Sequence, residues 1–156
     1  MNDAVMPRRP DEHGVPDPFP YMHPTLKDNY GNWAWHDRPR PGVLHHVAHS
    51  GDEIWTVRAG TQRQMDVGTI RKLCDLADEH ADGFVRFTTR SNAEFMCTSL
   101  DKTGPLIEAL NEEGFPVGGT GNSVSMISHT QGWLHCDIPG TDASGVVKSL
   151  MDELHH

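Results

Sequence analysis

The sequence predicts an α+β protein with a ferredoxin-like fold, in which two helices cover one face of an antiparallel sheet as in a split β-α-β unit. Two observations predict it. Segments with the two-residue period of strands and the wider period of amphipathic helices alternate in the order β-α-β-β-α between residues 44 and 117. Glycine also follows each of the two expected helices, where helices commonly end.

A proline-rich arm, residues 1–43, precedes this half-domain. Prolines at 7, 10, 16, 18, 20, 24, 39 and 41 exclude a long helix or a central strand. Aromatic side chains are uncommon in solvated, disordered tails, yet the arm contains Phe19, Tyr21, Tyr30, Trp33 and Trp35. We expect an ordered strap that contacts the body of the protein or a partner subunit; the alternative is a flexible leader.

The expected half-domain, residues 44–117, begins with extended segments. Residues 53–58 alternate with a period of two and are rich in β-forming residues. A helix follows, with Asp66 as its N-cap and an end near Ala81, before Gly83. Its expected apolar face consists of Val67, Ile70, Leu73, Cys74 and Ala77.

A hairpin and a second helix follow. Residues 84–89 and 93–98 are expected to be strands joined by a tight turn at Ser91-Asn92. Phe87 should face the helices, and Cys97 should lie in the core. The second helix stops at Gly114, residues 115–117 are a candidate last strand, and the apolar helix face consists of Leu106, Ile107 and Leu110.

The pattern changes after residue 117. Residues 119–123 are expected to be a loop, and residues 124–127 and 133–136 to be short extended pieces. Thr141-Asp142 caps a last helix, whose apolar face consists of Val146, Val147, Leu150, Met151 and Leu154. Because that face needs a sheet and few candidate strands remain, residues 118–156 are interpreted as the start of a second α/β domain.

The composition excludes several functions. The net charge of −9 argues against a nucleic-acid partner, and no apolar run approaches the roughly 20 residues of a membrane span. The N-terminus has no apolar signal core, so a cytoplasmic location is expected. Three scattered cysteines are not a disulfide framework.

Two segments indicate a site for a small anion. In Arg86-Phe87-Thr88-Thr89-Arg90, an extended backbone would place Arg86, Thr88 and Arg90 on one face, and two guanidinium groups can hold an oxyanion or a carboxylate. The glycine-rich segment Gly118-Gly119-Thr120-Gly121-Asn122 can form a nest of backbone N–H groups. The alternatives are a solvated sheet face for the first segment and a plain tight turn for the second.

Cys136 and a group of histidines are weaker candidates. Cys136 precedes a helix N-terminus, where a thiolate can be a metal ligand, but one cysteine cannot bind a cluster. His45 and His49 have a spacing that suits zinc only on a helix, and the local pattern is that of a strand. The sequence itself contains no recognisable nucleophile–base pair.

Several longer blocks resemble one family. In chain order they are Asn29-Tyr30-Gly31, Arg40-Pro41-Gly42-Val43-Leu44, Arg86-Phe87-Thr88-Thr89-Arg90, Gly114-Phe115-Pro116-Val117-Gly118-Gly119-Thr120-Gly121-Asn122-Ser123, His129-Thr130-Gln131-Gly132-Trp133-Leu134-His135-Cys136 and Thr141-Asp142-Ala143-Ser144-Gly145. Together they resemble the N-terminal part of the dissimilatory sulfite reductase beta subunit, from about residue 20 to the end of the chain.

The resemblance implies a function and a set of site residues. That family uses a sirohaem coupled to a [4Fe–4S] cluster to interconvert sulfite and sulfide-level sulfur. The resemblance implies that Arg90 faces the substrate anion or a sirohaem carboxylate. Arg86, Thr88 and Asn92 would support the macrocycle, and Thr89 lies within the same motif. The segment 118–122 would line the cofactor.

The same resemblance implies cofactor ligands and partners. Cys136 matches the first cluster ligand of the family, whose proximal thiolate bridges cluster and haem iron. The partners would be the alpha subunit, in a heterotetramer, and a small sulfur-carrier protein. The family's other cluster cysteines, in a Cys-Cys-x-x-x-Cys run, do not occur in this chain, and residues 123–126 lack a further substrate arginine. The chain is therefore expected to be a fragment or a truncated product, and the alternative function is a non-catalytic ferredoxin-like module that binds a partner or a small anion.

Overall fold

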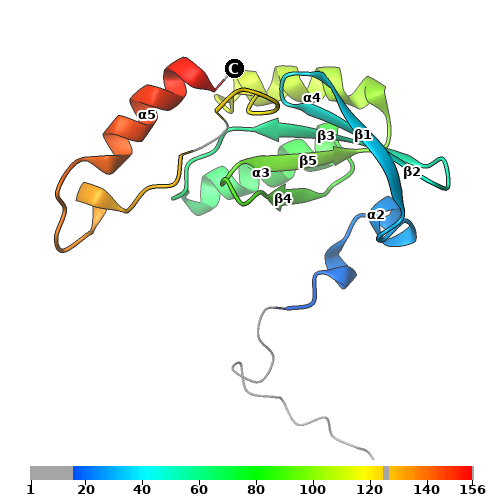
Figure 1. Ribbon diagram of the computed structural model, residues 1–156, viewed down its shortest axis with the longest axis horizontal. Helices are drawn as coiled ribbons and strands as arrows, with labels where there is room; N and C mark the ends of the chain where they lie inside the picture. Colours follow the sequence, from blue (N-terminus) through cyan, green and yellow to red (C-terminus); the bar gives the residue numbers. More distant parts are fainter. Residues whose placement is uncertain (1–15, 125–126, 156) are drawn as a thin grey trace, which may run out of the picture.

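The computed structural model describes residues 16–124 and 127–155. Figure 1 shows a sheet with helices beside it and a separate C-terminal helix. The elements, in chain order, are η1 (Phe19–Tyr21), α2 (Pro24–Asp28), β1 (Trp33–Arg40), β2 (Val43–Ala48), β3 (Glu53–Ala59), α3 (Val67–His80), β4 (Val85–Phe87), β5 (Ala93–Cys97), α4 (Leu100–Glu112), η2 (Gly132–Leu134) and α5 (Ala143–Leu154).

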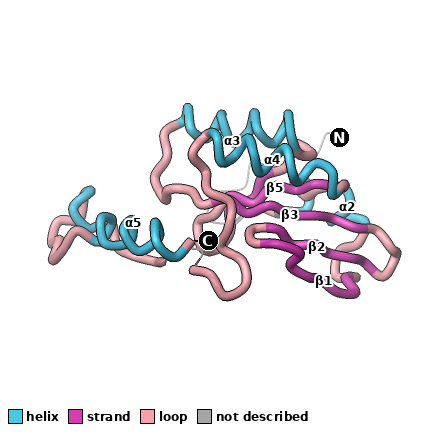
Figure 2. Tube along the Cα trace, turned by 90° about the horizontal axis from the view of Figure 1, so that it is seen from above, coloured by secondary structure: helices cyan, strands magenta, loops and turns pink. Residues whose placement is uncertain are grey.

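The sheet has five strands in the order β1-β2-β3-β5-β4, and each neighbouring pair is antiparallel. Figure 2 shows α3 and α4 together on one side of the sheet, with β1 farthest from them. The predicted α+β, ferredoxin-like architecture is therefore confirmed. We call the sheet side that faces away from α3 and α4 the open face.

The core lies between the sheet and these two helices. Val57 of β3 and Phe95 of β5 are cross-strand partners that face the helices, and both are fully buried. Leu106 and Leu110 of α4, as predicted, and Leu73 of α3 close the core from the other side. Burying one such side chain contributes about 1.5–3 kcal/mol, so this layer supplies most of the stability.

The apolar face of α3 is narrower than the sequence predicts. Asp66 is the N-cap, as expected, and its carboxylate accepts from the Thr69 N–H. The buried stripe, however, is Leu73, Leu76 and Ala77. The prediction that Cys74 is a core residue is wrong: consecutive helix positions point about 100° apart, and Cys74 is exposed.

The sheet begins within the segment predicted as an arm. β1 is an edge strand paired with β2, so the predicted boundary after residue 43 falls inside the sheet. An edge strand tolerates Pro39, because one side of the strand needs no backbone donors. The pairing is irregular between Asp37 and Arg40, next to that proline.

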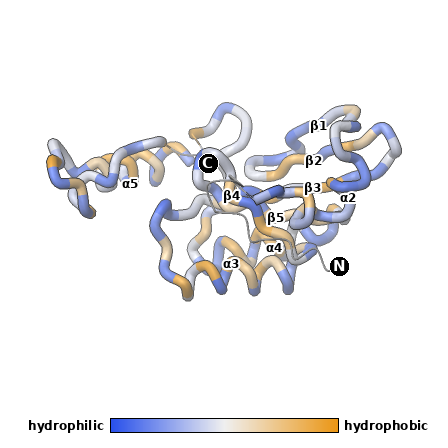
Figure 3. Tube along the Cα trace, turned by 90° about the horizontal axis from the view of Figure 1, so that it is seen from below, coloured by the Kyte–Doolittle hydropathy of each residue, from blue (hydrophilic) through white to orange (hydrophobic). Residues whose placement is uncertain are grey.

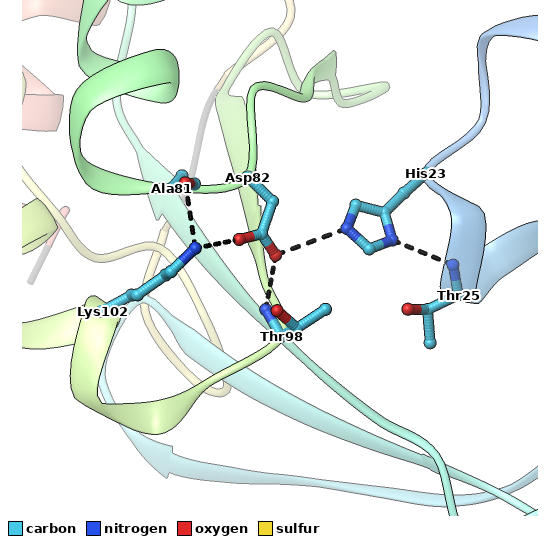
Figure 4. Close-up of polar contacts among 6 residues, drawn as sticks. All are labelled: His23, Thr25, Ala81, Asp82, Thr98 and Lys102. Atoms are coloured by element: carbon cyan, nitrogen blue, oxygen red, sulfur yellow. Dashed lines mark hydrogen bonds and ion pairs between the residues drawn. The ribbon is translucent and has the colours of Figure 1, made fainter.

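A partly buried network of hydrogen bonds and ion pairs joins the N-terminal segment to the half-domain (Figure 4). The Asp82 carboxylate accepts from the Thr98 N–H at 2.6 Å and from the Lys102 ammonium, and lies 3.3 Å from His23 Nε2. His23 Nδ1 accepts from the Thr25 N–H at 3.1 Å, which caps α2. Because Nδ1 is an acceptor, the Nε2–H faces Asp82. The segment before β1 is therefore held against the start of β4 and the end of β5.

The predicted last strand, residues 115–117, is reduced to one bridge, Ala59↔Val117. In a ferredoxin-like sheet the last strand would lie beside the first one, but here β2 occupies that edge of β3. Only the end of β3 is left for Val117. Gly42, in the β1–β2 turn, packs against the same place, where an added Cβ would lie 2.4 Å from Val117 Cγ1.

The regular elements of the C-terminal part are helical, and loops connect them. Residues 133–136 are not extended as predicted: Trp133 and Leu134 belong to η2, closed by a Leu134 N–H bond to the Gln131 carbonyl. Of the predicted strand 124–127, residues 125 and 126 lie outside the described residues, and Val124 and Ile127 are not in a strand.

The last helix, α5, has Asp142 as its N-cap, as predicted. It lies away from the sheet (Figure 1), and its hydrophobic positions are visible in Figure 3. Of the residues of α5, only Val147 is buried. The helix is attached through its end, where the Gly119 N–H donates to the His155 carbonyl at 3.0 Å. Among the described helices, none combines the length and the apolar character that crossing a membrane would require.

Two glycine substitutions should have opposite effects on stability. Gly42→Ala places a side chain at a φ of +77° and against Val117, so we expect the free energy of unfolding to fall by roughly 2 kcal/mol or more. Gly104→Ala, inside α4 with nothing within 4 Å of the new Cβ, should raise it by about 0.5–1 kcal/mol. Urea unfolding of both variants checks the pair; equal effects would contradict the packing at Gly42.

Acid should weaken the network around Asp82. Burial raises the pKa of Asp82, but hydrogen bonds from Lys102 and Thr98 outweigh it, so the pKa lies below its ordinary value. A carboxylate of this kind stabilises the fold above its unfolded pKa, about 3.9, and the stabilisation is lost as the pH falls through the lower folded value. We expect Asp82→Asn to cost about 2 kcal/mol at pH 7, and less in acid.

Urea unfolding at pH 7 and at pH 3 measures that difference. Asp75→Asn, at an exposed position of α3, is the control and should change stability little at either pH. A cost for Asp82→Asn that is the same at both pH values would show that the ionised carboxylate is not the stabilising form.

Candidate anion-binding site

A row of three charged side chains crosses the open face of the sheet. Glu94 of β5 lies between Arg58 of β3 and Arg86 of β4, each its direct cross-strand partner. Its Oε2 accepts from Arg58 Nε, and its Oε1 accepts from Arg86 Nη2 at 2.7 Å. We call these three residues the arginine row.

Burial makes this pairing necessary. Glu94 is 2% exposed, and removing a carboxylate from water costs several kcal/mol unless it is paired and hydrogen-bonded. Two guanidinium groups meet that requirement and leave the row with a net charge of about +1. The side chain of Arg58 is largely covered, whereas that of Arg86 is 54% exposed. The row therefore presents a cation at the surface of an acidic protein.

Two histidines lie on the same face. His36 of β1 and His46 of β2 are cross-strand partners with ring centroids 5.8 Å apart. Burial lowers the pKa of His46; Glu94 opposes this shift, and His36, Arg58 and Arg86 add to it. A His46 imidazole that stays neutral can donate and accept hydrogen bonds on this face of the sheet.

The predicted face of Arg86, Thr88 and Arg90 does not form as expected. β4 ends at Phe87, and Thr89 and Arg90 lie in the turn that follows. The period-two argument holds only for an extended backbone, and this strand is three residues long. Arg86 is on the open face, while Arg90 and Thr89 are exposed at the tip of the hairpin.

The hairpin turn uses Thr88 and Asn92 to close itself. The Thr88 N–H donates to the Asn92 carbonyl at 2.8 Å, and the Thr88 hydroxyl accepts from the Asn92 N–H at 3.1 Å. Ser91 takes a positive φ of 61°. Asn92 is 1% exposed, and its Oδ1 has no hydrogen-bond partner among the described residues. Phe87 shares the helix side with its partner Ala93 but is 54% exposed at the sheet edge.

The glycine-rich segment does not form an open nest of N–H groups. The Gly118 N–H donates to the Arg58 carbonyl at 3.2 Å, and the Gly119 N–H donates to the His155 carbonyl. The Thr120 hydroxyl accepts from the Gly42 N–H at 2.9 Å. The glycines serve close packing instead, since a Cβ on Gly118 would lie 2.7 Å from the His155 carbonyl oxygen.

The rest of that segment lies beside the sheet. Gly121 has a positive φ of 70°, and Asn122 is exposed. A Cβ on Gly121 would lie 3.4 Å from a guanidinium nitrogen of Arg38 on β1. The segment thus joins the end of β3, the β1–β2 turn and the end of α5, and the backbone N–H groups of Gly118 and Gly119 are engaged within the chain.

Cys136 lies apart from the arginine row. It follows η2, which packs against α5, away from the sheet in Figures 1 and 2. Its N–H donates to the Gly132 carbonyl at 3.1 Å, and the residue is partly buried. Within residues 16–124 and 127–155, no three His, Cys, Asp or Glu side chains are grouped to hold a metal ion.

A cleft of about 990 Å³ lies between residues 60–66 and α5. Its lining includes Leu134, Val147 and Met151, and none of the three residues of the arginine row. The cleft and the arginine row therefore lie in different parts of the molecule. We assign the candidate site to the charges, because an anion is recognised by fixed donors and cations.

Glu94 and Arg58 were not predicted from the sequence, although one signal was present. Once the turn is placed at residues 88–92, antiparallel pairing sets Arg86 opposite Glu94. A carboxylate among the buried neighbours Ala93 and Phe95 needs a partner. The position of Arg58 depends on the sheet order, which that hairpin alone does not reveal.

Comparison with known proteins identifies relatives of the chain. Residues 46–113 match the family described as the nitrite/sulfite reductase ferredoxin-like half domain. This match runs from β2 to the end of α4 and includes the whole arginine row. The expected ferredoxin-like half-domain is thus supported by both sequence and structure.

Three similar proteins are named "Sulfite reductase, dissimilatory-type subunit beta". The one from Archaeoglobus fulgidus is 48% identical over 141 residues, which cover 86% of this chain and 38% of the relative. Those from Nitratidesulfovibrio vulgaris and Megalodesulfovibrio gigas are 44% and 42% identical, and each alignment covers 99% of this chain. The alignments cover 44% and 63% of those two relatives, so the chain spans only part of their length.

A solved structure shares the fold. The crystal structure of dissimilatory sulfite reductase I (DsrI) superposes with a TM-score of 0.65 at 15% identity. The match covers 83% of this chain and 35% of that one. At this identity the likeness shows the fold alone.

The three cysteines should differ in reactivity. Burial raises the pKa of Cys97 to about 11, so at pH 8 about one thiol in a thousand is ionised. Cys74 is exposed and Cys136 is partly exposed. Ellman's reagent at pH 8 should therefore modify two thiols in the native chain, and the third only in denaturant. Cys97→Ala should leave the native count unchanged and Cys74→Ser should lower it; three fast thiols would contradict the burial of Cys97.

Proposed function

Because this chain is a relative of the dissimilatory-type sulfite reductase beta subunits, we propose that it acts as part of such a subunit. The enzyme would interconvert sulfite and sulfide-level sulfur by multi-electron transfer. The sequence identity of 42–48% over most of the chain carries this proposal. Since the chain spans 38–63% of those relatives, the activity is that of a larger assembly.

The proposed role of the described residues is to hold anions. Arg90, exposed at the hairpin tip, would contact the substrate anion or a carboxylate of the macrocycle. Arg86 has four N–H groups beyond the one given to Glu94 and is half exposed. Thr88 and Asn92 hold the turn that presents Arg90. Guanidinium groups recognise oxyanions and carboxylates through charge-assisted hydrogen bonds.

A carboxylate-bearing macrocycle fits these residues in charge. Sirohaem is a ring fringed with carboxylates, and the open face offers Arg86 and, on β2, the imidazole of His46. The unpaired Oδ1 of buried Asn92 is a further polar atom at this turn. When bound, sirohaem would supply the electron transfer to sulfur; Arg86 and Arg90 would bind and orient its carboxylates or the sulfite. Segment 118–122 would act by shaping the end of the sheet.

A complete [4Fe–4S] site does not fit the described residues. Such a cluster takes four thiolates, and Cys136 is the one cysteine in the proposed position. Cys97 is buried with a raised pKa, and Cys74 is on the outer side of α3. We therefore propose Cys136 as a cluster ligand only together with ligands from outside the described residues, and derive no step through the cluster.

The name of the relatives, "subunit beta", supports a heteromeric partner. We propose an alpha subunit in a heterotetramer and a small sulfur-carrier protein as partners, in the cytoplasm. The exposed aromatic residues of the N-terminal segment and β1, among them Tyr21, Tyr30 and Trp35, offer a surface for such contacts.

The test is cofactor content and turnover of the complete beta subunit that contains this chain, produced with an alpha subunit. We expect bound iron, the absorption of sirohaem and sulfite-dependent oxidation of a reduced dye. Arg90→Ala should lower kcat/KM for sulfite at least about tenfold, because it removes a charge-assisted contact worth about 1.5–3 kcal/mol.

Arg71→Ala, at an exposed position of α3 on the other side of the sheet, is the matched control and should leave turnover unchanged. A complex without iron and sirohaem would reject the enzyme function in favour of a binding module. Normal turnover in Arg90→Ala would reject the assignment of Arg90 alone.

A further inference from the structure

Among the described residues, the carboxylate of Glu94 is the one group that is hydrogen-bonded to both arginines of the row. One oxygen accepts from Arg58 and the other from Arg86. The carboxylate is nearly inaccessible, at 2% exposure, so solvent does not compete for it. The orientation of each guanidinium is consequently set by a group that is itself fixed in the sheet.

The two arginines differ in access to solvent. The side chain of Arg58 is 18% exposed and that of Arg86 is 54% exposed. A guanidinium carries five N–H groups, and Glu94 takes one from each arginine. Within the described part of the chain, no other acceptor is hydrogen-bonded to either guanidinium group. The remaining N–H groups of Arg86 are therefore available to an anion that approaches the open face.

We propose that Glu94 is a positioning residue, which holds Arg86 so that its free N–H groups face a bound oxyanion or carboxylate. This inference rests on the proposed role of Arg86 in holding anions. Arg58 contributes from the other side, because its Nε–H fixes the second oxygen of Glu94. Arg58 and the sheet thus fix the orientation of Glu94, and Glu94 fixes that of Arg86. Arg86 is the member of the row that contacts the ligand.

A simpler role for Glu94, that of a counter-ion, gives the opposite expectation. If charge alone mattered, replacing Glu94 by a neutral residue would raise the positive charge beside the site and strengthen anion binding. If orientation matters, the same change weakens binding, because the amide nitrogen of glutamine is a donor and would face one of the two guanidinium groups in place of an acceptor oxygen. The sign of the effect therefore separates the two roles.

The experiment is a titration of this chain with sulfite, followed by ¹⁵N NMR of the arginine side chains, in wild type and in Glu94→Gln. We expect sulfite to shift the Arg86 signals in wild type, and the affinity to fall about tenfold in the variant, as expected for loss of an oriented charge-assisted contact. Unchanged or tighter binding would overturn the proposal, as would a wild-type chain whose Arg86 signals do not respond to sulfite.

The control is Glu113→Gln, which removes a surface ion pair with Lys72 far from the open face. It has the same change of charge and should leave sulfite affinity unchanged. Thermal unfolding checks that both variants are folded. If Glu94→Gln does not fold, the rotation rate of the Arg86 guanidinium group in wild type, measured by NMR, tests the proposal instead. Slow rotation supports the proposal, and free rotation overturns it.

The titration needs no cofactor, so its result is independent of the proposed function. A complete enzyme that lacked sirohaem would reject the proposed function and leave this result unaffected.

Discussion

The buried carboxylate of Glu94 is the interaction on which the open face of this sheet depends. A carboxylate withdrawn from water must be paired, and the two partners come from the strands on either side of β5. The pairs Arg58–Glu94 and Arg86–Glu94 therefore join three strands in one row, on the face that α3 and α4 leave uncovered. The contact depends on the register of β4 that pairs Arg86 with Glu94. A shift by one residue would turn Arg86 toward the helices. The same strand register sets the position of the turn that carries Arg90.

Close packing at one end of the sheet explains why side chains, and not backbone groups, are left to meet a ligand. Gly42 and Gly118 allow the β1–β2 turn, the end of β3 and His155, which follows α5, to approach each other. The N–H groups of Gly118 and Gly119 are used in this junction. Among the described residues of the open face, an anion can therefore be bound by side-chain cations. An oriented guanidinium group is suited to binding an oxyanion or a carboxylate.

Local patterns are sufficient for α3, α4, α5 and the strands β3 to β5, but not for β1, for the short C-terminal pieces or for the site. Asp66, Gly114 and Asp142 mark helix ends through chemistry that acts within one turn, and the structure has helix ends at these points. The pairing of Arg58 with Glu94 spans 36 residues and depends on strand order, which no local pattern contains. The period-two rule fails for Arg90 because the strand ends at Phe87, before the turn that carries Arg90. Cys74 was misplaced by one position around a helix, and the role of Gly118 became clear only once His155 was found beside it.

The central proposal is that Arg86 and Arg90 of this acidic chain bind sulfite or the carboxylates of a macrocycle. Its most direct test is a structure of the complete enzyme, loaded with sirohaem and sulfite. The account predicts that a carboxylate of the macrocycle or the sulfite lies within hydrogen-bond distance, about 3 Å, of a guanidinium nitrogen of Arg86 or Arg90, with Glu94 still held between Arg58 and Arg86. A structure in which both Arg86 and Arg90 point into solvent, and the anionic groups are bound by other parts of the protein, would contradict it.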